Sequence, residues 1–144
     1  NGYQYEEAVV TNSSEVQQSV QSLVNKVDAI FVPNDSVIQS AMSQVAEIAK
    51  KAKIPVYGSS NVMVESGAFA TISISDEKIG AMSANMADQY FKGTPIEKIP
   101  AITLSEFDTI INQETAKAID VELSQEILDT AVMIEKTTQQ SNDS

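Results

Sequence analysis

The sequence predicts an α/β fold of three layers (αβα), in which helices cover both faces of a mainly parallel β-sheet. Three observations lead to this fold class. Short apolar runs alternate with amphipathic helical segments through the first two thirds of the chain, the order that is typical of parallel βαβ units. Residues 27–32 form an almost unbroken apolar run, as expected of a strand buried on both faces. Capping residues precede the helical segments, and lysine or glycine follows them.

Each element is justified by its periodicity and its flanking residues. The first helix has a capping-box spacing from Asn12 to Glu15, and Asp76 is the expected cap of the helix that ends at Phe91. Gly93 follows that helix, at the place where a helix commonly ends. The predicted strands are residues 5–10, 27–32, 54–58, 68–74, 100–104 and 109–111; the predicted helices are residues 13–25, 37–53, 76–91, 112–119 and one that starts at 124, with a helical turn or loop at 62–67.

The composition excludes several classes of protein. The 144 residues include no His or Cys, which excludes a disulfide, a thiol nucleophile, a Ser-His-Asp triad and the usual zinc sites. The formal net charge of -11 argues against a nucleic-acid partner, because such a surface must neutralise phosphates. The chain has no glycine-rich nucleotide motif, and no cofactor is predicted. It also has no apolar run of about 18 residues, the length that a membrane-spanning helix needs.

Polar clusters follow three of the predicted strands. In a parallel α/β sheet, ligands bind at the carboxyl ends of the strands. Asn and Ser side chains both donate and accept hydrogen bonds, free N–H groups at a helix start favour a carboxylate, and Asp35 is able to pair with an ammonium group. The clusters therefore predict a site for a small zwitterion such as an amino acid. The candidate ligand-binding residues are Asn34, Asp35, Ser36, Ser59, Ser60, Asn61, Ser73 and Ser75.

Two other interpretations of these residues remain open. Asn, Asp and Ser at the first turn of a helix commonly cap that helix and bind nothing else. Asp35 and Asp76 also suggest the carboxylate pair of a magnesium-binding phospho-acceptor domain, but such domains need a lysine after a later strand, and Tyr57 is followed by Gly58 and Ser59. No catalytic constellation emerges, so the sequence predicts a binding protein and not an enzyme.

Six segments occur in an order and spacing that are distinctive together: residues 27–35, 52–57, 65–71, 79–80, 91–95 and 111–119. Their order resembles the ABC-transporter substrate-binding proteins of the tryptophan/tyrosine type, over about residues 5–135. The same general pattern is similar to sugar-binding proteins and to the effector domains of related repressors. Relatives usually have Gly at the position of Asp120, Pro at that of Ser124 and often Gly at that of Ser73.

The resemblance implies a type I periplasmic-binding-protein fold, whose two lobes close on a ligand in the cleft between them. Residues 1–104 would form a Rossmann-like second lobe and residues 105–136 a returning C-terminal segment, followed by a disordered tail at 137–144. The eight candidate residues would face the cleft. The implied partners are an amino-acid-like ligand, with aromatic amino acids among the candidates, and an ABC permease in the membrane. The implied location of the full-length protein is extracellular, membrane-anchored or periplasmic.

The chain starts at Asn1 rather than at Met, so we expect it to be a piece of a longer protein whose signal or lipid anchor lies before it. Two rival functions stay open. One is the effector-binding domain of a transcriptional regulator or sensor with the same fold, and the other is a flavodoxin-like enzyme domain. The sequence upstream of Asn1 would distinguish a transport protein from the first rival. A test for flavin or magnesium binding would distinguish a transport protein from the second rival.

Overall fold

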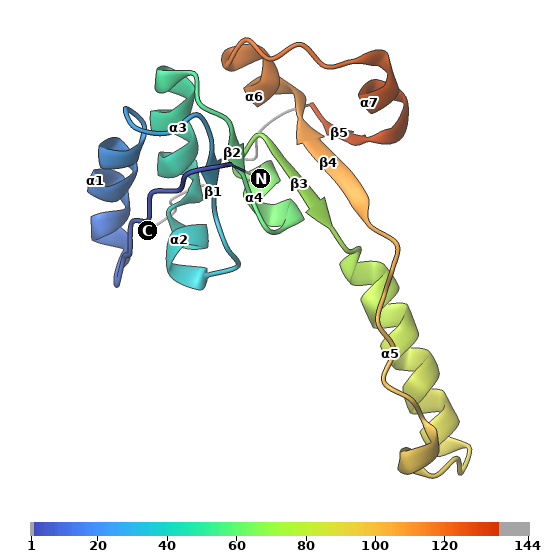
Figure 1. Ribbon diagram of the computed structural model, residues 1–144. Coiled ribbons are helices and arrows are strands. Elements are labelled where there is room, and N and C mark those ends of the chain that lie inside the picture. The colour runs from blue at the N-terminus through green and yellow to red at the C-terminus, as the bar shows by residue number, and fades with distance from the viewer. Residues whose placement is uncertain (1, 136–144) are drawn as a thin grey trace, which may run out of the picture. The chain divides into compact units, whose positions relative to one another are not determined.

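The computed structural model describes residues 2–135 and contains a five-stranded sheet with helices (Figure 1). The strands are β1 (Ile30–Phe31), β2 (Val56–Tyr57), β3 (Ala70–Ser73), β4 (Asp108–Asn112) and β5 (Val132–Ile134). The helices are α1 (Ser13–Leu23), α2 (Ser36–Ser40), α3 (Met42–Ala52), α4 (Asn61–Glu65), α5 (Asp76–Phe91), α6 (Gln113–Ala118) and α7 (Gln125–Thr130), with a 3-10 turn, η1 (Ile96–Lys98). None of the helices in this described part has the length and apolarity needed to cross a membrane.

The described chain divides into two compact units. The first comprises residues 2–72 and 109–135, and the second comprises residues 73–108. The division into residues 1–104 and 105–136 stays a prediction, and the tail predicted at 137–144 lies outside the described residues. The two units are described separately below.

The sheet runs in the order β1-β2-β3-β4-β5. The pairs β1–β2, β2–β3 and β4–β5 are parallel, with Ile30 opposite Val56 and Phe31 opposite Tyr57. The α/β class with a mainly parallel sheet is therefore confirmed. Because successive strand residues point to opposite faces, Ile30 and Val56 are buried beneath helices while Phe31 and Tyr57 are exposed.

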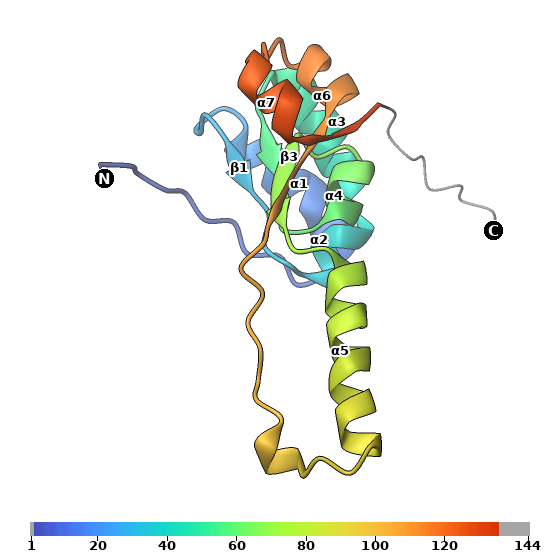
Figure 2. The ribbon, with the colours of Figure 1, turned by 90° about the vertical axis from the view of Figure 1, so that its right-hand side faces the viewer.

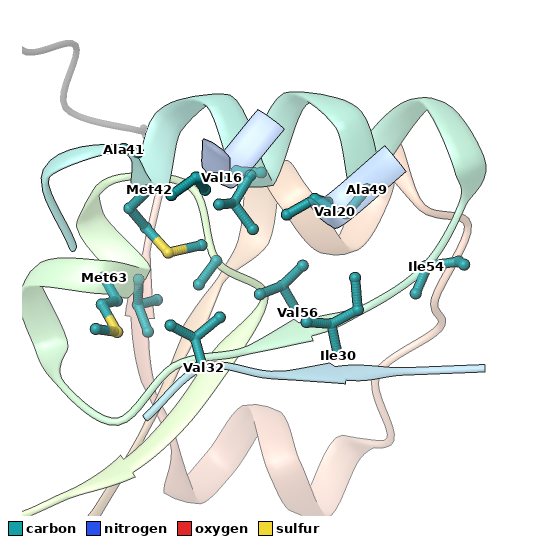
Figure 3. Close-up of a cluster of buried hydrophobic side chains, with 14 of the residues drawn as sticks. Val16, Val20, Ile30, Val32, Ala41, Met42, Ala49, Ile54, Val56 and Met63 are labelled. Atoms are coloured by element: carbon teal, nitrogen blue, oxygen red, sulfur yellow. The ribbon is translucent and has the colours of Figure 1, made fainter. Parts of the chain in front are cut away.

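The main core of the first unit lies between β1, β2 and the helices α1, α3 and α4. Figure 3 shows Ile30, Val32 and Val56 directed toward the side chains of α1 and α3. In Figure 2, α2, α3 and α4 lie on one side of β1 and β3. Met42 and Met63 are fully buried and fill this core. A second cluster joins Phe69, Ala70, Ile111, Ala116 and Ile119.

Local side-chain contacts explain where the helices begin and end. Asn12 caps α1 by accepting a hydrogen bond from the Ser14 N–H, and Glu15 accepts one from the Thr11 N–H at 2.9 Å. The cap predicted for α5 at Asp76 is wrong, because Ser75 caps this helix and Asp76 is its first residue.

The end of α5 agrees with the sequence. Gly93 follows the last turn with a φ of 93°, a left-handed conformation that glycine adopts without strain. The helix therefore ends at Phe91 as predicted, and it begins one residue earlier than a cap at Asp76 implies.

Some predicted elements are absent or shorter. The strands predicted at 5–10 and 100–104 are wrong: neither segment has a neighbouring strand to bond with, so both are irregular. The helix predicted at 37–53 is interrupted at Ala41, whose φ of −105° and ψ of 11° separate α2 from α3. The strand at 27–32 shortens to β1, and β5 was not predicted.

The second unit consists of α5, η1 and the extended chain that returns to Asp108. No side chain of α5 is buried. Lys78 Nζ lies 3.0 Å from Glu106 Oε2, which ties the start of the helix to the returning chain. A shallow hollow of about 330 Å³ is lined by apolar residues of both segments, including Ile79, Met82 and Leu104.

Candidate functional site

Two of the predicted polar clusters lie at the same edge of the sheet. Asn34, Asp35 and Ser36 follow β1, and Ser59, Ser60 and Asn61 follow β2. Since β1 and β2 are parallel neighbours, their carboxyl ends meet at one rim. The first unit thus brings together six of the eight candidate residues by topology. Ser73 and Ser75 belong to the second unit and are considered within it.

Asp35 serves as the N-cap of α2. Its Oδ1 accepts hydrogen bonds from the N–H groups of Val37 at 2.8 Å and Ile38 at 3.1 Å. These are the amide groups that would otherwise face an anionic ligand at the helix start. The capping interpretation therefore holds for Asp35, and its carboxylate remains exposed to solvent.

The cluster after β2 is arranged differently. Asn61 Nδ2 donates to Glu65 Oε1 at 2.8 Å, and the Ser59 hydroxyl lies 3.7 Å from the Met63 sulfur. Ser60 occupies the N-cap position of α4, but its side chain makes no capping hydrogen bond. Its hydroxyl oxygen is buried without a hydrogen-bond partner among the described residues. A buried hydroxyl without a partner is uncommon, and a bound ligand or water would satisfy it.

The two serines of the second unit both bond to nearby backbone. Ser75 Oγ accepts a hydrogen bond from the Lys78 N–H at 3.3 Å, as the cap of α5. Ser73 Oγ donates to the Ile74 carbonyl at 3.2 Å. Lys78 has a raised pKa, first because its ammonium donates to the Glu106 side chain and then because the Asp108 charge lies nearby. Local structure thus accounts for the hydrogen bonds of both serines.

An apolar hollow of about 610 Å³ adjoins the start of the second cluster. It is lined by aromatic side chains, by Gly58 and Ser59, and by apolar residues from β3, β4 and the α6–α7 connection. Tyr57 and Phe69 meet edge to face, with ring centroids 5.6 Å apart and an interplanar angle of 77°. Phe69 is buried, whereas Tyr57 is 40% exposed and Phe31 is 69% exposed.

The exposure of Phe31 could not be predicted from the sequence. Phe31 lies inside the apolar run 27–32, which predicts burial on both faces, so nothing in the run marks it as exposed. Within residues 2–135, no group of three or more acidic side chains is placed to hold a metal ion. The rim offers hydroxyl, amide and carboxylate groups for hydrogen bonding, beside aromatic surface.

Comparison with known proteins identifies the family. Residues 1–134 match the model of the family described as ABC transporter substrate binding protein. A curated relative, the "Tyrosine-binding protein" of Clostridioides difficile (strain R20291), is 39% identical over 122 residues. That match covers 85% of this chain but 35% of the relative, so the chain spans about a third of the relative's length.

Two solved structures have a similar fold. One is the ligand-free, open form of a substrate binding protein with adhesive properties from Clostridium difficile, with a TM-score of 0.80 and 33% identity; the match covers 94% of this chain and 45% of that one. The other is an ABC domain in complex with L-Trp from Streptococcus pneumonia, with a TM-score of 0.76, 29% identity and coverages of 89% and 43%. With a family match along nearly its whole length, this chain belongs to the ABC transporter substrate-binding protein family, as its segment order predicted.

Proposed function

We propose that this chain is most of one lobe of the solute-binding component of an ABC importer, and that the complete protein binds an aromatic amino acid. The ligand would lie in a cleft between two lobes, against the rim formed by the clusters after β1 and β2. The protein would bind and release its ligand unchanged, without catalysis. Delivery to a permease and an extracytoplasmic location, anchored to the membrane or periplasmic, are part of the same proposal.

The observation that carries the proposal is the buried Ser60 hydroxyl, which has no partner among the described residues and lies at the rim of the sheet. Asn61, with donor and acceptor atoms, follows it directly, and the exposed carboxylate of Asp35 follows the neighbouring parallel strand β1 at the same rim. Hydroxyl and amide groups suit the carboxylate of an amino acid, and Asp35 suits its ammonium group. The exposed rings of Phe31 and Tyr57 offer apolar surface to an aromatic side chain.

The comparisons support the ligand class. One relative is named for binding tyrosine, and one structural neighbour was solved with L-Trp. Both ligands combine a zwitterionic end with an aromatic ring. A rim that places polar groups beside aromatic surface has the complementary chemistry.

The mechanism follows from sharing the ligand between lobes. If each lobe supplies half of the contacts, the ligand binds the closed state more tightly than the open state and shifts the protein toward closure. The same argument predicts that the 144-residue chain binds weakly or not at all, because it holds half of the contacts. Titration calorimetry that gave micromolar affinity of this chain for L-Tyr or L-Trp would contradict the shared-cleft mechanism.

The decisive experiment uses the complete gene product that contains residues 1–144. Its affinity for L-Tyr and L-Trp is measured by titration calorimetry for the unaltered protein, Ser60→Ala and Asn34→Ala. Each change should weaken binding by about 1–3 kcal/mol if the side chain contacts the ligand. Ser60→Ala should leave the melting temperature unchanged, because the hydroxyl bonds to no other described group.

Ser22→Ala is the matched control, since Ser22 is an exposed residue of α1 whose hydroxyl donates to the Ser19 carbonyl. It should leave the affinity unchanged. If Ser60→Ala and Asn34→Ala bind as tightly as the unaltered protein, the rim does not form the ligand site. If neither amino acid binds the unaltered protein, the proposed ligand class is wrong.

A further inference from the structure

Asn61 and Glu65 form a side-chain pair on helix α4. Asn61 is the first residue of this helix and Glu65 is the last, so the two side chains lie on one helical face. Asn61 Nδ2 donates to Glu65 Oε1 at 2.8 Å, in a partly buried hydrogen bond. An ionised carboxylate only accepts hydrogen bonds, so it attracts the nitrogen end of the amide and repels the oxygen end. Glu65 therefore decides which way the Asn61 amide points.

The carbonyl oxygen of Asn61 takes no part in this pair. With Nδ2 directed to Glu65, Oδ1 points away from Glu65, because the two atoms diverge from the amide carbon. No group among residues 2–135 donates a hydrogen bond to this oxygen. Asn61 therefore presents an unused acceptor at the start of α4. It follows directly on Ser60, whose buried hydroxyl also lacks a partner in the described chain.

The backbone of α4 is held in place by the core. Met63, labelled in Figure 3, and Val64 are fully buried. The buried Asn112 amide donates to the Val64 carbonyl at 2.9 Å, beside Glu65 in the chain. Because these contacts fix the end of the helix that carries Glu65, its carboxylate is held where the Asn61 amide reaches it. The orientation of Asn61 is thus set before a ligand arrives, which lowers the cost of binding.

The charges of the rim indicate which end of an amino acid meets the Asn61 oxygen. Residues 33–36 and 58–66 contain no Lys or Arg, and their two acidic residues are Asp35 and Glu65. Asp35 Oδ1 accepts from the first amides of α2, whereas no group in the described chain donates to Asp35 Oδ2. Acceptor oxygens without a cation in these segments suit an ammonium group, which has three N–H donors.

Strand pairing puts the two acceptors at equivalent places. Phe31 pairs with Tyr57 across the parallel strands β1 and β2, and Asp35 and Asn61 each stand four residues beyond this pair. Both acceptors therefore follow their strands by the same length of chain and belong to neighbouring segments of one rim.

We propose that Glu65 is a positioning residue of the ligand site: it turns the Asn61 amide so that Oδ1, together with Asp35, accepts hydrogen bonds from the ammonium group of the ligand. This inference rests on the proposed amino-acid ligand and adds which end of the ligand these acceptors hold. The carboxylate of the ligand then falls to donors such as the Ser60 hydroxyl. Glu65 acts through Asn61 and does not touch the ligand.

A double-mutant cycle in the complete gene product tests the positioning role. Glu65→Gln keeps the length of the side chain, but the new amide donates as well as accepts, so Asn61 is able to turn. L-Tyr and L-Trp should bind about threefold to tenfold more weakly, as expected for the loss of one hydrogen bond. In an Asn61→Ala background, Glu65→Gln should cause no further loss of affinity. A loss that persists in that background would show that Glu65 acts by its own charge or through the fold, and would overturn the proposal.

Two ligand analogues test the ammonium contact, as competitors of L-Tyr. Tyramine keeps the ammonium group of tyrosine and lacks the carboxylate, whereas the desamino analogue of tyrosine keeps the carboxylate and lacks the ammonium group. Glu65→Gln should weaken the binding of tyramine as it weakens that of L-Tyr, and should leave the desamino analogue unaffected. A change that only disturbed the packing of α4 would weaken all three ligands alike, and that result would overturn the proposal.

Gln125 and Asp129 supply the matched control. Gln125 Nε2 donates to Asp129 Oδ1 at 2.8 Å on α7, which is the same amide–carboxylate pair at the same spacing. Helix α7 carries none of the candidate ligand-binding residues. Asp129→Asn should therefore leave the affinity for each ligand unchanged.

NMR without ligand separates this inference from the proposed function. In the ligand-free complete product, the Asn61 Hδ2 protons should show nuclear Overhauser effects to the Glu65 methylene protons. If these effects are absent, Glu65 does not orient Asn61 and the proposal is overturned, even where the amino acids bind. If the effects are present and the unaltered protein binds neither amino acid, the orientation of Asn61 is supported and the proposed ligand is wrong.

Discussion

Gly58 tests the close approach between the loop after β2 and helix α4. Gly58 is buried, and its N–H donates to the Ala70 carbonyl at 3.0 Å, which holds the loop against β3. A Cβ atom added at this position would lie 2.8 Å from Met63 Cβ and 3.3 Å from Met63 Sδ. Met63 is fully buried on α4, so the loop or the helix must move to accept Gly58→Ala.

The magnitude follows from two opposing terms. Overpacking of a well-packed core costs about 1–3 kcal/mol. Replacing glycine with alanine restricts the unfolded chain, and this raises the free energy of unfolding by about 0.4–1 kcal/mol where the native backbone tolerates alanine. Because Met63 Cβ is fixed to the backbone of α4, rotation of its side chain cannot relieve the contact. We therefore expect a net loss of about 1–2 kcal/mol in the free energy of unfolding.

Urea unfolding followed by circular dichroism measures this loss. Gly80→Ala is the matched control, because an added Cβ at Gly80 meets nothing within 4 Å and the residue lies inside α5. This control should stabilise its helix by about 0.5–1 kcal/mol. Gly58→Ala with unchanged stability would refute the close-approach argument. An equal loss in Gly80→Ala would assign the effect to glycine replacement in general.

Three further changes test the caps. Asn112→Ala should lower the free energy of unfolding by about 1–3 kcal/mol in urea, because this fully buried side chain bonds to two backbone groups. Hydrogen bonds from Thr11 hold the pKa of Glu15 below its ordinary value of 4.5. The stabilisation from the ionised Glu15 is therefore present above pH 4.5 and is lost as the pH falls through the lowered pKa. Glu15→Gln should reduce the dependence of the free energy of unfolding on pH in this acid range, measured by urea titrations at several pH values. Asp35→Asn should keep stability within about 0.5 kcal/mol, because Asn caps as well as Asp, while weakening amino-acid binding by the complete protein.

Each of these expectations has a contradicting result. Asn112→Ala with the urea midpoint of the unaltered chain would show that the buried amide is dispensable. If the free energy of unfolding of Glu15→Gln depends on acid pH as strongly as that of the unaltered chain, another group causes this dependence. Unchanged affinity in Asp35→Asn would leave Asp35 as a cap only and would remove it from the proposed ammonium contact.

Local signals predicted the elements that local interactions build. Helix α5 was predicted to within one residue of its observed bounds, because its apolar spacing and Gly93 act within one segment. The predicted strand at 5–10 failed because strand formation needs a neighbour, and the described chain gives this segment none. The short strand β5 was missed for the converse reason: residues 132–134 become a strand by pairing with β4, which is distant in sequence.

One departure from the family pattern has a structural explanation. Asp120 adopts a φ of 61° after α6, in the left-handed region where the resembling proteins usually have Gly. Asp tolerates this conformation better than most residues with a side chain. Its carboxylate also lies 3.0 Å from Lys53 Nζ, which in turn donates to the Ala118 carbonyl. The turn is therefore kept, with an ion pair beside it.

The candidate site shows why residue type alone does not separate caps from ligand contacts. Asp35 and Ser60 occupy equivalent positions, each directly before the helix that follows a parallel strand. Asp35 satisfies the first amides of its helix, whereas Ser60 caps nothing and keeps its buried hydroxyl without a partner in the described chain. The sequence places both residues at the rim, but only the hydrogen bonds distinguish them. A polar residue at a cap position that does not cap is therefore the stronger candidate for contacting a ligand.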